Sequence, residues 1–308
     1  MSETAKTAEE WSPVGQVPLF SPGRIWVLTT STFTQLVRMK TFYFLIVFAV
    51  LVAAASNLNL LYTSAQKLRI LKDASFGAMS IFSWLFAIAA TAVLIPRDLE
   101  DRTLYTILAK PVPRLEYLLG KLFGVLLTIG VALVVMQVLF TGFLFYREVT
   151  VLAGERQMLE AQGLAPEDIR AQLDLIRAQG VQWQLLYALV AIFLKAAVVA
   201  ALTMLVSTFA SSTLFTMIVA TIVFLVGHFH KLAAGYWMHE MGDSLIAKVF
   251  VKPVLMIIPD FRVFNVTENI VGGTPVAFGA MATLVGLALL YIAVYTAVAL
   301  YLFIDKEF

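Results

Sequence analysis

Cysteine is absent from this sequence, and charged side chains are scarce. Of its 308 residues none is Cys and 14% are Asp, Glu, Lys or Arg, compared with about 25% in soluble domains. The lack of Cys excludes a disulfide scaffold. With 17 Gly and 10 Pro, the chain is also too poor in both residues for a collagen-like repeat. The net charge of +2 gives no electrostatic reason to expect a nucleic-acid partner.

The residues that are present are mostly apolar. Apolar side chains make up 60% of the sequence and the mean hydropathy is +0.87, whereas soluble domains contain about 45 to 50% apolar residues. Such a chain is too apolar for disorder, and its surplus of apolar side chains needs a lipid bilayer to cover it. The length allows about six spans of ~20 residues and leaves little for a soluble domain. We therefore expect an all-α polytopic membrane protein.

Six apolar stretches are long enough, with tilt, to cross about 30 Å of hydrocarbon at 1.5 Å per residue. Six spans would place both termini on the same side of the membrane. A further apolar segment, Ser244–Ile258, is short and is interrupted by Lys248, Lys252 and Pro253. It predicts a re-entrant region within residues 229–274, and a seventh crossing is the alternative. The six predicted spans are Thr41–Leu61, Phe76–Pro96, Leu118–Tyr146, Trp183–Val206, Ser212–His228 and Pro275–Ile304.

The N-terminal part divides into a polar tail and an amphipathic helix. Residues 1–20 carry charges of both signs and predict a flexible tail. Ser21 followed by Pro22 is typical of a helix start. Apolar residues then recur at helical spacing, with polar residues on the opposite face, so we expect a helix that lies on the membrane surface. A cytosolic continuation of the first span is the alternative. The apolar residues are Ile25, Trp26, Leu28, Phe33, Leu36 and Val37, and the polar ones are Arg24, Gln35, Arg38 and Lys40.

Residues 147–182 form the longest hydrophilic stretch between two predicted spans. Pro166 with Glu167 and Asp168 is typical of a first helical turn, and Gly180 of a stop. Together they predict a helical hairpin outside the membrane. The hairpin can cap a translocation path or bind a partner, and a plain amphipathic connector is the alternative.

One ionisable side chain falls in the middle of a predicted span. An ionised group such as Lys195 costs about 2.5 to 3.5 kcal/mol at that depth, so it is expected to face protein or water. Gln137 in the preceding span lies at a comparable depth and can accept a hydrogen bond from it. A role in the pathway, a structural bond between helices, and extension toward the interface all remain open for Lys195.

Two further groups of side chains are candidates for function. His228, His230 and His239 fall within twelve residues and are a candidate metal site, with ordinary interfacial histidines as the alternative. Phe261 and Phe264 precede the last span. They can cover the mouth of a pathway, or they are interfacial aromatic residues.

Residues 97–121, between the second and third predicted spans, have the features of a short rigid helix outside the membrane. Asp98 and Arg102 are one turn apart with the acid first, which is the favourable order. Pro111 ends such a helix and Pro113 can begin the next. Such an element can transmit force from a protein docked beneath it, and a solvated surface loop is the alternative. Leu104, Tyr105 and Leu108 share one face of this helix.

This segment resembles the cytoplasmic coupling loop of ABC-2 type permeases, the membrane subunits of one class of ATP-binding-cassette exporters. Members of that family show an acidic start, a Thr, a Leu, a Pro-x-x-Arg and a Gly-Lys that enters the third span. Arg102 stands where the family often has Gly. The matching positions in this sequence are Glu100, Thr103, Leu108, Pro111, Arg114, Gly120 and Lys121.

The resemblance extends over residues 21–308, because the order of surface helix, six spans and re-entrant region is also similar. It implies a transmembrane permease domain in contact with membrane lipid and with a second copy of itself or a close paralogue. It also implies an ABC ATPase subunit that presses on the coupling loop. The residues implied in ATPase coupling are Glu100, Asp101, Arg102, Thr103, Leu104, Tyr105, Leu108, Pro111 and Arg114.

The sequence contains no nucleotide-binding loop of the Gly-x-x-x-x-Gly-Lys-Ser/Thr type. The Gly120-Lys121 pair lacks both the earlier Gly and the following hydroxyl. We therefore expect neither enzyme activity nor a cofactor in this chain, with ATP and Mg²⁺ bound by the partner. The family implies a bacterial inner membrane location with both termini in the cytoplasm. Lys and Arg are nearly balanced between the two sides and do not decide the orientation.

Three other functions remain open. A membrane enzyme is disfavoured because the spans hold almost no acids and no paired catalytic groups. A secondary transporter or channel would need several buried carboxylates or broken helices, whereas Lys195 stands alone. The third keeps the family but replaces transport by transmission of force to an extracytoplasmic partner through residues 147–182. The sequence does not predict the substrate.

Overall fold

The structure, a computed structural model, describes residues 21–40, 42–43, 46–47, 50, 63–100, 113–210, 212–229 and 258–304. Several predicted features lie outside these residues. They are the tail 1–20, most of the span Thr41–Leu61, residues Asp101 to Pro111 of the coupling loop, most of the region 229–274, and His230 and His239.

The described part of the chain is helical and contains no strand, which confirms the all-α prediction. Its elements, in chain order, are α1 (Pro22–Val37), α3 (Ser64–Glu100), α5 (Arg114–Ala161), α6 (Pro166–Arg177), α7 (Leu185–Phe209), α8 (Thr213–His228), the 3₁₀ helix η3 (Phe261–Phe264), α11 (Thr267–Val271) and α12 (Phe278–Ile304).

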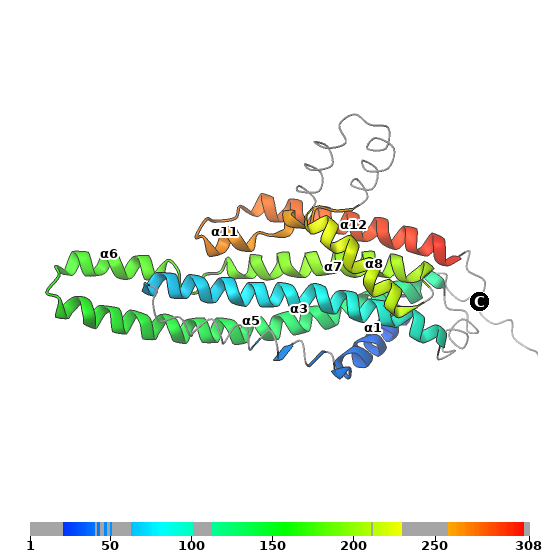
Figure 1. Cartoon of the computed structure of the whole chain (residues 1–308), viewed down its shortest axis with the longest axis horizontal. Coiled ribbons are helices and arrows are strands. Elements are labelled where there is room, and N and C mark those ends of the chain that lie inside the picture. Colours follow the sequence, from blue (N-terminus) through cyan, green and yellow to red (C-terminus); the bar gives the residue numbers. More distant parts are fainter. Residues whose placement is uncertain are drawn as a thin grey trace, which may run out of the picture.

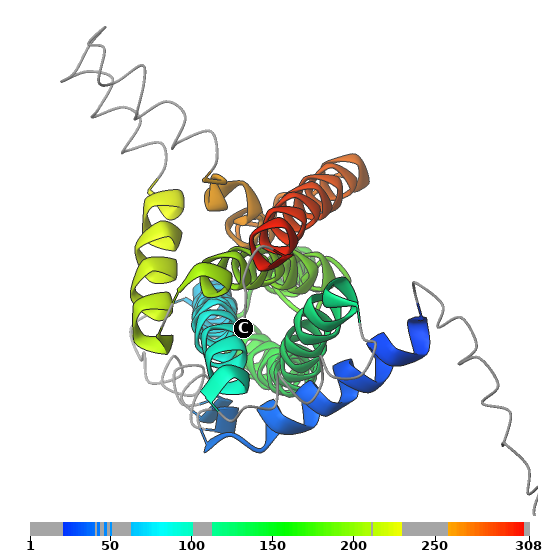
Figure 2. The same cartoon turned by 90° about the vertical axis from the view of Figure 1, so that its right-hand side faces the viewer.

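Helices α3, α5 and α7 run side by side along the long axis of the molecule (Figures 1 and 2). Two of them are longer than the spans predicted from apolar residues, since α3 begins at Ser64 and α5 continues to Ala161. With 48 residues, α5 is about 72 Å long, more than twice the ~30 Å of hydrocarbon. Its apolar stretch ends near Tyr146, but no Pro follows before Ala161, so the helix continues beyond the apolar stretch.

The predicted hairpin outside the membrane consists of the end of α5 and the short helix α6. Pro166 is the first residue of α6, as expected, and the chain turns before it at Gly163, which has a φ of 73°. Ile176 of α6 is buried and belongs to the apolar core. Figure 1 shows α6 lying antiparallel to α5 at the end of the bundle away from α1.

Polar contacts fix this hairpin to α3 and to the chain that enters α7. The Ser64 hydroxyl donates to Glu155 Oε2 at 2.5 Å, and the Lys72 ammonium donates to Gln179 Oε1 at 2.8 Å. Glu148 accepts a hydrogen bond from the backbone N–H of Val181 at 2.9 Å. The hairpin is therefore packed against the bundle and continues it.

In the part of the chain that the structure describes, four helices are long and apolar enough to cross a membrane, namely α3, α5, α7 and α12. The predicted span Ser212–His228 corresponds to α8, whose 16 residues reach only about 24 Å. In both views α8 is inclined to the long axis of the bundle (Figures 1 and 2). Because the span Thr41–Leu61 lies mostly outside the described residues, the count of six spans stays a prediction, and so does the re-entrant region.

Helix α7 is the centre of the core. Its most apolar stretch is 78% buried, whereas that of α12 is 28% buried. Alanines at positions such as Ala196, Ala197 and Ala200 are fully covered and let neighbouring helices approach closely, as small residues do in membrane bundles. Helix α12 therefore has the largest share of apolar surface left for lipid or for another subunit.

Helix α1 lies across one end of the bundle, so that Figure 2 shows it from the side while α3, α5 and α7 are seen end-on. It packs on α5 through a Gly-x-x-x-Gly pair, Gly120 and Gly124. A Cβ atom at Gly120 would lie 2.5 Å from Leu28 Cβ, and one at Gly124 would lie 2.4 Å from Thr32 Cβ. Only glycine allows this approach.

The face of α1 that meets α5 differs in part from the predicted apolar face. Thr29, Thr32 and Leu36 are buried, whereas Trp26 is exposed. The Thr29 hydroxyl donates to the carbonyl oxygen of Gly120 at 3.4 Å, which satisfies a polar group in the contact. Close backbone approach selects small side chains, and apolar periodicity alone cannot reveal that preference.

Replacing Gly124 by Ala tests this contact. The added methyl group would overlap Thr32, so we expect Gly124→Ala to lower the free energy of unfolding by about 1–3 kcal/mol. Titration with SDS in mixed micelles measures the change. Gly142→Ala, on the same helix with nothing within 4 Å of the new methyl group, is the control and should leave stability unchanged or slightly raised. Equal effects of the two variants would contradict close packing of α1 against Gly124.

Candidate functional site

A buried polar cluster joins the last turn of α3 to the first turns of α5. The Lys121 ammonium lies 2.7 Å from Asp98 Oδ2, and the Tyr117 hydroxyl donates to the same oxygen at 2.6 Å. Asp98 and Lys121 are each 7% exposed and Tyr117 is fully buried. Because a buried charge is tolerated only with partners, the three groups fix where α3 ends relative to α5. Residues 101–112, the α3–α5 loop, connect these two ends.

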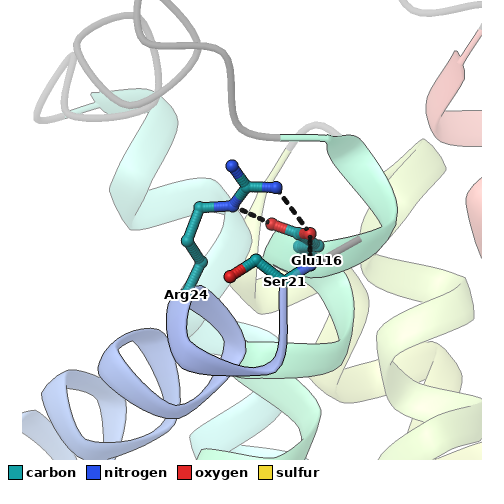
Figure 3. A network of polar contacts seen from close by, with 3 residues as sticks. All are labelled: Ser21, Arg24 and Glu116. Carbon is teal, nitrogen blue, oxygen red and sulfur yellow. Dashed lines mark hydrogen bonds and ion pairs between the residues drawn. The ribbon is translucent and has the colours of Figure 1, made fainter. Parts of the chain in front are cut away.

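A second set of contacts holds the start of α1 on α5. The fully buried Glu116 accepts two hydrogen bonds from the Arg24 guanidinium, from Nε at 2.6 Å and from Nη2 at 2.9 Å. It also accepts one from the backbone N–H of Ser21 at 2.5 Å. Figure 3 shows the carboxylate beside Arg24 of α1 and Ser21, the residue that precedes α1. Glu116 therefore supplies both a bidentate partner for Arg24 and an acceptor at the beginning of α1.

This carboxylate also keeps its partner ionised. Hydrogen bonding to Glu116 raises the pKa of the Arg24 guanidinium above its ordinary value. An arginine is protonated throughout the physiological range, and the shift moves it further from deprotonation. The contact between α1 and α5 is thus charged at any pH near neutrality.

A third set of contacts attaches the end of α12. Arg114 Nη1 donates to the carbonyl oxygen of Phe303 at 2.6 Å and also to that of Ile304. The Arg114 guanidinium lies 5.9 Å from the centroid of the Phe303 ring, and Tyr117 stacks on that ring at 5.9 Å between centroids. A cation at the last carbonyls of a helix is favourable because those groups lack partners within the helix.

The first turns of α5 therefore contact three other helices. Arg114, Tyr117 and Lys121 recur at spacings of three and four and face α3 and α12, whereas Glu116 and Gly120 face α1. We call these five residues the anchor. The anchor therefore joins the first turns of α5 to α1, α3 and α12.

The predicted pathway residues lie elsewhere in the bundle. Lys195 on α7 is buried, and its ammonium lies 5.6 Å from the centroid of the Phe224 ring. Gln137 Nε2 donates to Thr141 at 3.2 Å, and no hydrogen bond joins Gln137 to Lys195 although the structure describes both. The expected bond between these two helices is therefore not formed.

The two phenylalanines that precede the last predicted span belong to the apolar core. Phe261 and Phe264 of η3 are almost completely buried, and the Phe261 ring lies 5.2 Å from that of Phe224. A Cβ atom at Gly227 would approach Phe261 Cδ2 to 2.7 Å, so η3 is tightly packed on α8. They hold η3 on α8 instead of lying open at a surface.

No group of three potential metal ligands occurs among the residues that the structure describes. His228 stacks on Phe224 with 5.9 Å between ring centroids. Since His230 and His239 fall outside the described residues, the metal site proposed for the three histidines stays a prediction.

Comparison with protein families gives one match, described as ABC-2 family transporter protein, over residues 23–308. The matched range contains every described helix apart from the first residue of α1. The chain belongs to the ABC-2 transporter family. It is therefore an integral membrane protein and a permease subunit of an ABC transporter, and membership implies association with an ABC ATPase. A comparison with curated individual proteins finds no match.

Of the positions expected to couple this ABC-2 permease to an ATPase, the structure describes two. Glu100 is the last residue of α3, and Arg114 is the first residue of α5. The other coupling positions lie in the α3–α5 loop, outside the described residues. They are Asp101, Arg102, Thr103, Leu104, Tyr105, Leu108 and Pro111.

Sequence reasoning missed several members of the anchor of this permease. Of these, Lys121 is indicated only by the family resemblance, and Glu116 and Tyr117 are not indicated at all. Gly124, which contacts α1 one turn beyond the anchor residue Gly120, is not indicated either. A signal was present, because Glu116, Gly120 and Gly124 recur every four residues on one face of α5. Without knowledge of which helix crosses that face, the pattern does not name α1.

Neutralising Glu116 should release α1. In Glu116→Gln the amide no longer balances the Arg24 charge, so we expect α1 to separate from α5 more often. Because the chain has no Cys, a single Thr32→Cys placed in the buried contact reports this opening through its rate of maleimide labelling. We expect that rate to rise by a factor of about ten, as 1.4 kcal/mol would produce.

The matched control for this experiment is Glu160→Gln, which neutralises an exposed acid paired with Arg156 one turn away on the same helix. Exposed pairs of that kind contribute little, so labelling of Thr32→Cys should not change. Labelling that is insensitive to Glu116 would show that the glycine contact alone holds α1.

Removing one charge of the buried pair between α3 and α5 should destabilise the protein more than removing both charges. Asp98→Asn leaves the Lys121 ammonium buried without its carboxylate, and we expect a loss of about 3–5 kcal/mol in unfolding free energy. The double variant Asp98→Asn with Lys121→Met removes both charges and should recover most of that loss. SDS titration of the two single variants and the double variant gives the coupling energy. Additive effects would contradict direct pairing.

Proposed function

We propose that this chain is the permease subunit of an ATP-driven exporter. A separate ABC ATPase binds ATP and Mg²⁺ and hydrolyses the nucleotide, and this chain holds neither a cofactor nor a catalytic site. The ATPase presses on the α3–α5 loop, and the spans rearrange to move substrate across the membrane. The observation that carries the proposal is the anchor, because both ends of the loop are tied to buried charged groups.

The contacts of the anchor support a defined route for the applied force. The loop begins after α3, whose Asp98 is bound to Lys121 and Tyr117, and it ends at α5, whose Arg114 is bound to the end of α12. Buried charge-assisted hydrogen bonds of this kind resist separation of the helices that they join. Movement of the loop would thus tilt or shift α3, α5 and α12 together.

A dimer is part of the proposal, with a second copy or a close paralogue as the other membrane subunit. Helix α12 and one face of α5 support it, because they leave much apolar surface for a subunit or lipid. We also propose an inner-membrane location with both termini in the cytoplasm. Supporting this, the beginning of α1 and the end of α12 both contact the first turn of α5, so they lie at the same end of the bundle.

One observation favours a second candidate function, the transmission of force to an extracytoplasmic partner. Helix α5 runs without a break from the anchor to the α5–α6 hairpin, and Ser64 and Lys72 of α3 bind that hairpin. Movement at the anchor would therefore also reach the hairpin. In this case the hairpin binds a partner and no substrate crosses.

Purification of the tagged chain in mild detergent tests the main proposal. We expect a Walker-motif ATPase to be recovered at a fixed stoichiometry, and reconstituted vesicles to show ATP-dependent transport. An isolated chain that moves solute along an ion gradient without ATP would instead establish a secondary transporter. ATPase activity that drives no transport but depends on a protein bound to the hairpin would favour the second candidate.

Leu108 is the position of choice for uncoupling the complex. A carboxylate in the apolar face of the α3–α5 loop should disrupt contact with the ATPase, so we expect Leu108→Glu to reduce the permease-stimulated ATPase rate about tenfold or more. Because Leu108 is not one of the five residues of the anchor, we expect the melting temperature of the permease to stay the same. Leu175→Glu on α6, where the leucine is 68% exposed at the other end of the molecule, is the control and should keep full stimulation. A loss of stimulation in both variants would argue against docking at the loop.

A further inference from the structure

A cavity of about 360 Å³ lies between α3, α7, α8 and α11. It is lined on α3 from Asp73 to Trp84, so it extends about 16 Å along that helix, in the part of α3 that is far from the anchor. Its volume is within the range of small-ligand sites. Four ionisable side chains line it, namely Asp73, Lys195, His228 and Glu268.

The cavity contains a buried cation that has no anion beside it in the described part of the chain. Lys195 is 7% exposed, lines the cavity, and forms neither a hydrogen bond nor an ion pair with the described residues. The Phe224 ring at 5.6 Å offsets only part of its desolvation, because a cation–π contact is weaker than a salt bridge in such a place. An anionic group in the cavity would supply the missing partner.

Two carboxylates line the same cavity from different elements. Asp73 belongs to α3, and Glu268 belongs to α11, where it accepts a hydrogen bond from Asn265 at 2.9 Å. A ligand with a single sign of charge would meet attraction from one group and repulsion from another. A ligand that carries both an anion and a cation can satisfy Lys195 and the two acids together.

Two of the residues that line the cavity are apolar and exposed. Ile81 on α3 is 41% exposed and Leu225 on α8 is 42% exposed. Helix α3 is a candidate membrane span and α8 is a shorter apolar helix, so we place this part of the surface against lipid. A hydrocarbon chain attached to a polar group in the cavity can pass between Ile81 and Leu225 into the lipid without exposing apolar surface to water.

We propose that this cavity binds the headgroup of a zwitterionic phospholipid-like amphiphile. The phosphate of the amphiphile pairs with Lys195, its ammonium group lies near Asp73 and Glu268, and its acyl chains pass between Ile81 and Leu225 into the bilayer. Binding needs only this chain, so the proposal goes beyond the ATP-driven function and does not depend on it. Failure to recover an ATPase would leave it intact, and its own failure would leave the coupling proposal intact.

Native mass spectrometry of the full chain in detergent tests the proposal with two probes, dioleoyl-phosphatidylethanolamine and dioleoyl-phosphatidylglycerol. They share the phosphate and the chains, and only the first carries an ammonium group. We expect the ethanolamine lipid to bind about ten times more tightly, the difference that one favourable ionic contact produces. Equal affinities for the two lipids in the unmodified protein would overturn the proposal.

Variants separate the two charged parts of the site. Lys195→Met should weaken both lipids about tenfold, because both lose the partner of their phosphate. Asp73→Asn should weaken only the ethanolamine lipid and so remove the preference, and Glu268→Gln provides the same test if Asp73→Asn fails to fold. Unchanged binding by Lys195→Met would contradict a phosphate at this position.

Lys72→Met is the matched control. Lys72 is as buried as Lys195, but its ammonium donates to Gln179 and does not line the cavity. Its replacement should leave both affinities within about twofold of the original, so a loss as large as that of Lys195→Met would overturn a specific role for Lys195. Soluble phosphoethanolamine is a third probe, and binding as tight as that of the lipid would overturn the proposed exit of acyl chains.

Discussion

The need to give every buried charge a partner determines the arrangement at one end of this permease. Asp98, Glu116 and Lys121 are buried where water cannot solvate them, and each has a charged partner on another helix. Removing a partner would leave a charge whose burial costs several kcal/mol, so the helices cannot separate independently. In a membrane the hydrophobic effect gives little driving force for packing one helix against another, because lipid is as apolar as Leu or Val. Contacts between buried charges therefore determine the relative positions of these helices.

Apolar length and helical periodicity were sufficient to predict the helical class and the region of each long helix that is described. The proline signal at Pro166 also predicted the first residue of α6. The ends of α3 and α5 were not predicted, because hydropathy marks where an apolar stretch stops, whereas the helix can continue beyond it, as α3 does past Pro96 to Glu100 and α5 does to Ala161. Apolar windows therefore locate spans better than they locate helix ends.

The candidate site was predictable in part. The charges and prolines of the segment that contains Asp98, Arg114 and Lys121 indicated a candidate site. The residues that these side chains contact could not be predicted. Arg24 and Glu116 are 92 residues apart, and their pairing depends on α1 crossing α5 at Gly120 and Gly124. Such a crossing follows from three-dimensional packing, and a single sequence contains no direct record of it.

The unbroken length of α5 has a mechanical consequence. A helix of 48 residues behaves as one stiff rod about 72 Å long, and a rotation of about 5° around its midpoint would move each tip by roughly 3 Å in opposite directions. In such a rotation a displacement of one end of α5 reaches the other end with the same amplitude and in the opposite direction.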